Sequence, residues 1–121
     1  MNRASKLRLE TCHKDLRILL SVAIKKFDIL VLTGHVGEDE QRRKYIEDVS
    51  PFIYPDSAHN SSPSMAVDVR VYGVNDDYFA GCLMGMAYTL YDQGFITHRL
   101  TWGANRGLSK YHFELVRNGN E

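Results

Sequence analysis

Residues 57–69 read Ser-Ala-His-Asn-Ser-Ser-Pro-Ser-Met-Ala-Val-Asp-Val, and this stretch decides the interpretation of the whole chain. It places His59 on a serine-rich loop and Asp68 inside a short apolar run that is typical of a β-strand. Serine side chains in such a loop can hydrogen-bond to the backbone and hold its shape. The stretch therefore predicts a histidine and a carboxylate on adjoining, ordered elements.

Side chains alternate between the two faces of a strand, so the sequence predicts which residues share a face. In the predicted strand 65–72, Asp68 lies on the face opposite the valines. In the predicted strand 110–117, His112 and Glu114 share the face that points away from the apolar side chains. Two histidines and an aspartate on ordered elements, with one ligand position left open, are the donor set of a catalytic zinc site.

The same residues have a plainer interpretation, in which a hydrogen-bonded turn leads into an ordinary strand. The spacing between His59 and His112 does not by itself define a zinc motif, unlike the His-Glu-x-x-His pattern on a helix. The other histidines, His13, His35 and His98, are interpreted as structural or surface residues.

The remaining chain predicts a single α+β domain over residues 1–121, in which helices pack on one face of a small antiparallel sheet. Residues 1–8 are polar and basic and predict a loose lead-in. Apolar side chains at steps of three and four predict a helix between Leu9 and Phe27, and Thr11 is its candidate N-cap. Further elements are predicted as a strand over 28–33, a helix over 38–49, a loop over 50–63, a helix over 77–93 capped by Asn75 or Asp76 and stopped by Gly94, a strand over 96–102 and a loop over 103–110.

The composition excludes several classes of partner. The formal net charge is zero, so there is no bulk electrostatic case for binding nucleic acid or an anionic membrane, and we expect neither as a partner. Cys12 and Cys82 match no Cys-x-x-Cys spacing and are interpreted as buried thiols, with a disulfide as the alternative. We expect a monomer.

Two stretches resemble the zinc motifs of a known family. Residues 57–69 resemble the first motif, and Tyr-His-Phe-Glu-Leu at 111–115 resembles the second motif, of the M15 family of zinc metallopeptidases. These peptidoglycan-cutting enzymes include D-alanyl-D-alanine carboxypeptidases and phage L-alanyl-D-glutamate endopeptidases. Four other stretches resemble the family in the same order: TCHKDL at 11–16, TGHVGEDEQ at 33–41, YFAGCLMGMAYTLYDQG at 78–94 and LTWG at 100–103.

The resemblance implies a Hedgehog/DD-peptidase-like fold and an endolysin-like activity on peptidoglycan peptides. The zinc ligands that it implies are His59, Asp68 and His112. A water in the open position would be activated by Zn²⁺ for attack on an amide carbonyl. The residues assigned to substrate binding are Ser57, Ser64 and Trp102.

Two positions depart from the family pattern. The family places an acidic base three residues before its last zinc histidine, where this chain has Ser109, and a hydroxyl is too weak a base for that task. The family also places an arginine where this chain has Val36, and losing such an oxyanion donor typically costs about 100- to 1000-fold in rate. Glu114 is a candidate replacement base, or alternatively it only holds the zinc histidine. His35 and Arg106 are candidate replacements for the arginine.

Three hypotheses follow from the sequence. The chain is an active zinc peptidase of cell-wall peptides, or a catalytically impaired zinc-binding homologue that serves as a wall-binding or interaction module, or a metal-free domain. Since the first residues contain no apolar leader, we expect synthesis in a cytoplasm without a signal peptide and action on the cell wall after release.

Overall fold

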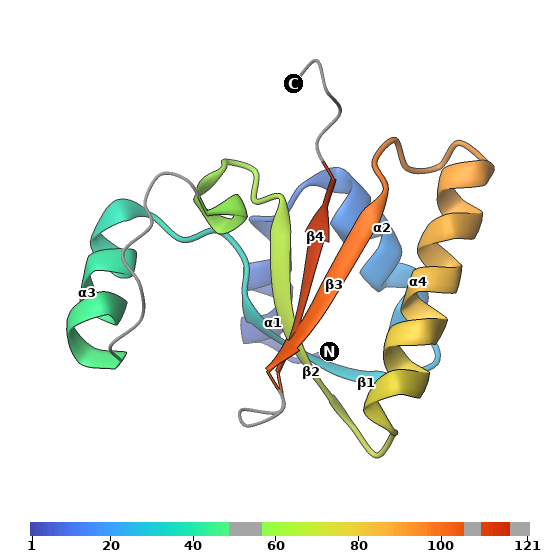
Figure 1. Cartoon of the computed structure of the whole chain (residues 1–121), viewed down its shortest axis with the longest axis horizontal. Coiled ribbons are helices and arrows are strands. Elements are labelled where there is room, and N and C mark those ends of the chain that lie inside the picture. The colour runs from blue at the N-terminus through green and yellow to red at the C-terminus, as the bar shows by residue number, and fades with distance from the viewer. Residues whose placement is uncertain (49–56, 106–109, 117–121) are drawn as a thin grey trace.

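The computed structural model describes residues 1–48, 57–105 and 110–116 (Figure 1). This part of the chain has an α+β fold, as the sequence predicts, with helices packed on one antiparallel sheet. The helices are α1 (Arg3–Glu10), α2 (Lys14–Ala23), α3 (Glu38–Asp48), the 3-10 turn η1 (Ala58–Asn60) and α4 (Asp76–Asp92). The strands are β1 (Asp28–Thr33), β2 (Ala66–Tyr72), β3 (Leu100–Asn105) and β4 (Lys110–Leu115).

The sheet has the order β1-β2-β4-β3, and every neighbouring pair is antiparallel. One face is covered by α2 and α4, which bury the valines of β2 and the aromatic side chains of β4. Phe79 of α4 packs edge-on against this face, with its ring 5.2 Å from the ring of Tyr111 and 5.9 Å from that of Phe113. The core therefore lies between α2, α4 and one side of the sheet, and the other side carries Asp68 of β2 and His112 of β4.

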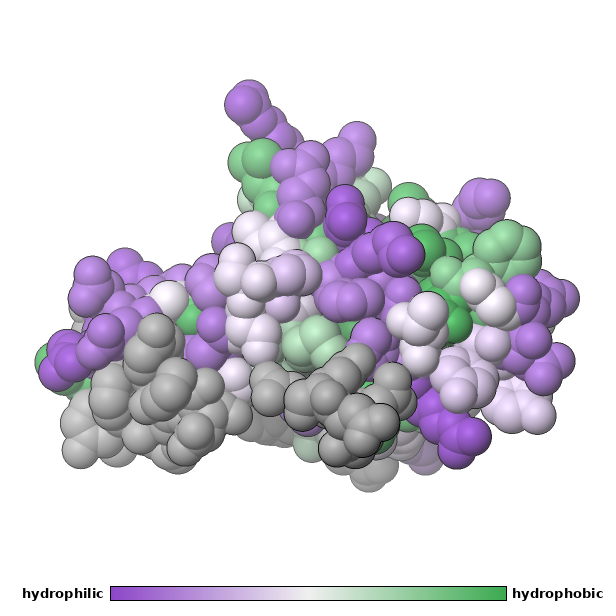
Figure 2. Space-filling view, turned by 90° about the horizontal axis from the view of Figure 1, so that it is seen from above, coloured by the Kyte–Doolittle hydropathy of each residue, from purple (hydrophilic) through white to green (hydrophobic). Residues whose placement is uncertain are grey.

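The two ends of the molecule differ in surface character. Figure 1 shows α3 at the far end of the molecule from α4. In Figure 2, hydrophobic surface gathers at the α4 end, whereas the surface around α3 is mostly hydrophilic. This difference follows from the sequences, because α3 carries charged residues on most of its turns and α4 is largely apolar.

The predicted loose lead-in is wrong, because α1 begins at Arg3 with Asn2 as its N-cap. This polar helix is held by tertiary hydrogen bonds to the edge strand β1 that its composition does not reveal. Ser5 is fully buried, and its hydroxyl accepts a hydrogen bond from the backbone N–H of Val31 at 3.0 Å. Arg8 donates from Nη1 to the carbonyl oxygen of the same valine at 3.0 Å. Helix α1 thus satisfies backbone groups that a sheet edge would otherwise leave unpaired.

The helix that follows α1 has a different N-cap from the predicted one. Thr11 is the C-cap of α1, and the N-cap of α2 is His13, whose Nδ1 accepts a hydrogen bond from the backbone N–H of Asp15 at 3.0 Å. A neutral imidazole has one acceptor nitrogen and can do this work as an asparagine would. The predicted helix is therefore divided in two at residues 11–13.

Strand β3 begins later than predicted, at Leu100 rather than at residue 96, and continues to Asn105. The reason is a buried carboxylate. Asp15 accepts hydrogen bonds from the backbone N–H groups of Thr97 and His98, at 2.9 and 3.0 Å, so this segment has its donors occupied before the sheet begins. Gly94, with φ of 81°, ends α4 in the left-handed conformation, as its sequence position predicts.

Both cysteines are free thiols; Cys12 is buried and Cys82 is half-buried. Burial raises the pKa of the Cys12 thiol to about 11. Among the helices in the described part of the chain, none combines the length and the apolar character required to cross a bilayer.

Candidate metal centre

Strands β2 and β4 bring Asp68 and His112 together on the sheet face opposite the core. The two residues are direct cross-strand partners, and Nδ1 of His112 lies 2.7 Å from Oδ1 of Asp68. The alternation of side chains predicted this shared face from sequence. Both side chains are attached to paired strands rather than to loops, so their relative position is set by backbone register.

His59 reaches the same point from η1, which is fixed by reciprocal capping. The hydroxyl of Ser57 accepts from the backbone N–H of His59 at 3.2 Å, and the Asn60 side chain accepts from the backbone N–H of Ser57 at 3.1 Å. A further hydrogen bond joins the Val36 N–H to the His59 carbonyl at 2.8 Å. The histidine is therefore held by its backbone before any ligand is considered.

The imidazole of His59 presents an unsatisfied nitrogen to the cluster. Its Nδ1 lies 2.8 Å from the carbonyl oxygen of Gly34, which can only accept, so Nδ1 carries the hydrogen. A side chain on Gly34 would overlap the Arg8 carbonyl, so this close backbone approach requires glycine. The other nitrogen, Nε2, is buried and lies 3.3 Å from Oδ1 of Asp68, yet it has no hydrogen-bond partner within the described ranges.

Asp68 is a carboxylate at neutral pH. Burial alone would raise its pKa, but the hydrogen bond with His112 and the close approach of the His59 imidazole outweigh burial and hold the pKa well below its ordinary value. The hydrogen bond with Asp68 in turn raises the pKa of His112, against an opposing effect of burial. The cluster therefore combines a fixed negative charge with two imidazoles that face it.

These donors fit a zinc ion. One ligand atom from each of His59, Asp68 and His112 lies within 4.8 Å of the others. A neutral His59 would turn its Nε2 lone pair toward an oxygen that also only accepts, and a cation between the two atoms removes this conflict. These three residues would hold the metal, through two nitrogens and one carboxylate oxygen, which is the set found in catalytic zinc sites.

Two charged residues of β4 contact the outer atoms of the cluster. Glu114 lies with Oε1 3.0 Å from Nε2 of His112, and Lys110 lies with Nζ 3.2 Å from Oδ2 of Asp68. The Glu114 contact matches the alternative in which it holds the ligand histidine, since metal-binding histidines usually donate their other N–H to a carboxylate or carbonyl. Lys110 is not among the site residues predicted from the sequence, although its position two residues before His112 places it on the same strand face.

The residues assigned to substrate binding lie elsewhere or are occupied. Ser64 is fully buried, and its hydroxyl donates to the Ala66 carbonyl at 2.6 Å, so it offers no surface to a substrate. Trp102 is the cross-strand partner of Phe113 and so belongs to the face that α4 covers, away from the cluster. Ser57 uses its hydroxyl as the cap of η1.

The structure describes one of the two positions that depart from the pattern of the resembled family, Val36, and one of the two candidate replacements for the arginine, His35. Val36 is buried at 5% exposure, and its carbonyl accepts from the Asn60 side chain at 2.9 Å, so it braces η1. His35 has Nδ1 2.7 Å from the carbonyl oxygen of Ser61, so its ring is tied to the loop after η1. Ser109 and Arg106 lie outside the described residues.

A second group of potential ligands, formed by His13, Asp15 and His98, lies at the start of α2. Oδ2 of Asp15 accepts from the backbone and hydroxyl of Thr97 and lies 2.9 Å from Nδ1 of His98. Burial would raise the pKa of the Asp15 carboxyl, but hydrogen bonds from His98 and Thr97 lower it overall. The positive end of the α2 dipole favours this carboxylate and opposes a cation, so we interpret the group as a brace between α2 and the segment before β3.

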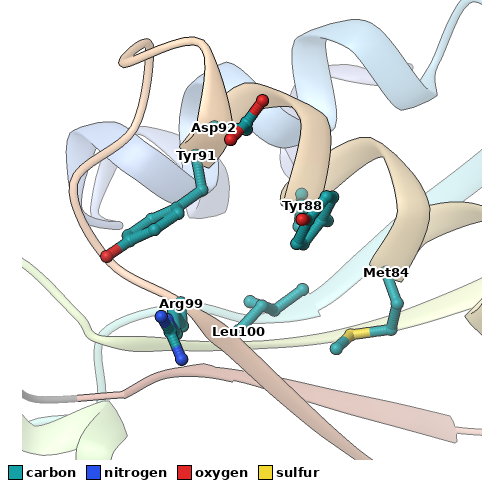
Figure 3. Close-up of a pocket in the computed structure, with 7 residues that line it drawn as sticks. Met84, Tyr88, Tyr91, Asp92, Arg99 and Leu100 are labelled. Carbon is teal, nitrogen blue, oxygen red and sulfur yellow. The ribbon is translucent and has the colours of Figure 1, made fainter.

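A pocket of about 340 Å³ lies between α4 and the start of β3 (Figure 3). Its lining includes Tyr88, Tyr91 and Asp92 of α4, together with Arg99 and Leu100. The Arg99 guanidinium lies 5.3 Å from the centre of the Tyr91 ring, in cation–π contact. No residue of the His59, Asp68 and His112 cluster lines this pocket, which lies on the covered side of the sheet.

A comparison with solved structures finds a protein with a similar fold. No family model and no curated protein matches the chain. The crystal structure of the L-Ala D-Glu endopeptidase ChiX from Serratia marcescens superimposes with a TM-score of 0.63 and 19% identity, over 96% of this chain and 89% of that one. The chain therefore has a peptidase-like fold; at this identity, the likeness concerns the fold alone.

Proposed function

We propose that this chain is a zinc-dependent peptidase of the M15 type that hydrolyses amide bonds in cell-wall peptides. The observation that carries the proposal is the buried Nε2 of His59, which faces the Asp68 and His112 pair and has no hydrogen-bond partner in the part of the chain that the structure describes. The likeness in fold to an L-Ala D-Glu endopeptidase supports a peptidoglycan peptide as the substrate.

The chain's own residues prepare such a site for zinc. The Gly34 carbonyl fixes the tautomer of His59, and the Glu114 carboxylate accepts from Nε2 of His112, leaving Nδ1 for the metal. Asp68 stays ionised and supplies the negative charge that a dication needs. When bound, zinc would lower the pKa of a coordinated water and so supply a nucleophile at neutral pH. We assign Glu114 to the orientation of His112 rather than to proton transfer.

A second candidate function is a zinc-binding wall-recognition module with little turnover. The observation that favours it is Val36, a buried apolar residue at the position where the family resemblance places an arginine. A site without that cation would bind the peptide but stabilise the developing negative charge of the reaction poorly.

The test is the release of free amino groups from purified peptidoglycan by the zinc-loaded protein, with and without 1,10-phenanthroline. We expect release that the chelator abolishes and added zinc restores. His59→Ala should abolish it, whereas the control His13→Asn, which removes an imidazole outside the cluster and keeps a side chain that can cap α2, should retain it.

Sedimentation with insoluble peptidoglycan distinguishes the two candidates. Co-sedimentation without release of amino groups would favour the recognition module. If the zinc-loaded protein neither bound peptidoglycan nor released amino groups from it, both functions would be overturned.

A further inference from the structure

Lys110 places a positive charge at the rim of the cluster. It occupies β4 two residues before His112, and its ammonium lies 3.2 Å from Oδ2 of Asp68. The Lys110 side chain is 34% exposed, whereas that of Asp68 is 7% exposed. The ion pair therefore joins a buried carboxylate to an ammonium that still reaches solvent.

The ammonium can serve Asp68 and a ligand together. A lysine ammonium has three N–H donors, and the contact with one carboxylate oxygen uses one of them. Oδ1 of Asp68 faces the two histidines, so Oδ2 remains for Lys110 when Oδ1 takes part in metal binding. Asp68 thus holds the ammonium beside the cluster, and the other N–H donors remain for a ligand.

The charges around the site favour an anion. A divalent cation and Lys110 bring three positive charges, against the two carboxylates of Asp68 and Glu114. A metal-loaded site is then net positive and attracts a negatively charged peptide. Val36 is uncharged, and within the described ranges Lys110 is the lysine or arginine that forms an ion pair with the cluster.

We infer that Lys110 is a specificity-determining residue that binds a free carboxylate of an acidic peptide next to the bond to be cut. The inference rests on the proposed function and narrows its substrate to peptides that carry a carboxylate, rather than a carboxamide, at that position. A half-exposed, charge-assisted hydrogen bond predicts a preference of about three- to tenfold.

The experiment compares the binding of L-alanyl-D-glutamate and its α-amide, L-alanyl-D-isoglutamine, to the zinc-loaded protein. Amide chemical shifts of the protein give both dissociation constants, and the ligand signals show whether each peptide stays intact. The variants are Lys110→Met, which keeps the apolar stem, and Lys110→Arg, which keeps the charge. Zinc stoichiometry and circular dichroism establish that each variant retains its site and fold.

The inference predicts tighter binding of the acid than of the amide by the parent and by Lys110→Arg, and equal binding of the two by Lys110→Met. If Lys110 only held Asp68, the methionine variant would weaken both ligands alike and keep their ratio, which would overturn the inference. Equal binding of the two peptides by the parent would overturn it as well and leave the proposed function standing. If the parent bound neither peptide, both the inference and the proposed function would be overturned.

Discussion

Asp68 and His112 face each other across β2 and β4 with 2.7 Å between Oδ1 and Nδ1, and this pair anchors the candidate metal centre. The two residues are fixed by strand register, and His59 approaches from a capped 3-10 turn. Because all three are held by backbone structure, the site is organised before a metal arrives. Such preorganisation is what a catalytic metal site requires.

Replacing Glu114 by glutamine tests whether the carboxylate holds His112. The neutral amide accepts a weaker hydrogen bond from Nε2 and leaves the ring less basic. We expect zinc affinity to fall by about 10- to 100-fold in a chelator competition assay. The matched control is Glu10→Gln, an exposed residue of α1 outside the cluster. Unchanged affinity in Glu114→Gln would show that the contact does not support the metal ligand.

Val36→Arg tests whether the position named by the family resemblance can hold a cation. The Val36 side chain is buried beside η1, so a guanidinium there must lose its hydration or displace the turn. We expect the free energy of unfolding to fall by about 2–4 kcal/mol in urea titrations. Ile46→Arg on exposed α3 is the control and should change little. A stable Val36→Arg protein with higher activity would contradict this account and show that the turn accommodates the charge.

Asp15→Asn tests the brace between α2 and the segment before β3. Because folding lowers the pKa of Asp15, its ionised form stabilises the folded state above the unfolded pKa of about 3.9, and this contribution is lost as pH falls through the folded pKa. We expect Asp15→Asn to be less stable than the parent at pH 7 by about 1.5–3 kcal/mol. The difference should shrink below about pH 4.

Urea titrations at pH 7, 5, 4 and 3 measure this dependence. The control is Asp28→Asn, because Asp28 is an exposed residue at the start of β1. A stability difference between Asp15→Asn and the parent that stays constant from pH 7 to pH 3 would mean that the carboxylate charge is not what holds the segment.

The two cysteines should react at different rates with a thiol reagent at pH 8. Cys12 is 1% exposed with a pKa of about 11, so few of these thiols are ionised and the reagent reaches them poorly. Cys82 is half-buried and should react first. Cys82→Ser should lose the fast phase of the reaction. In about 8 M urea, which unfolds most small proteins, both thiols of the parent should react. Equal rates in the folded parent would contradict the burial of Cys12.

The alternation of side chains in the two strands was sufficient to predict that Asp68 and His112 share a face. The first strand was likewise predicted at its observed bounds, because Asp28–Thr33 is a short apolar run followed by glycine. These features depend on local pattern, and local pattern is what a sequence displays directly.

The features that could not be predicted from the sequence depend on contacts between residues far apart in the chain. Helix α1 exists because Ser5 and Arg8 satisfy the edge of β1, and β3 begins late because Asp15 holds residues about eighty positions away. The ion pair of Lys110 with Asp68 likewise joins two strands. The family resemblance assigned Ser64 to substrate binding, but the packing of the chain buries this residue completely.

Zinc stoichiometry, by isothermal titration of the metal-free protein with Zn²⁺, tests the central claim most directly. We predict one zinc per chain, lost in His59→Ala and retained in His13→Asn, in which the asparagine still caps α2 but the second group has lost an imidazole. Absence of zinc binding by the parent, or binding that survives His59→Ala and disappears in His13→Asn, would contradict the account.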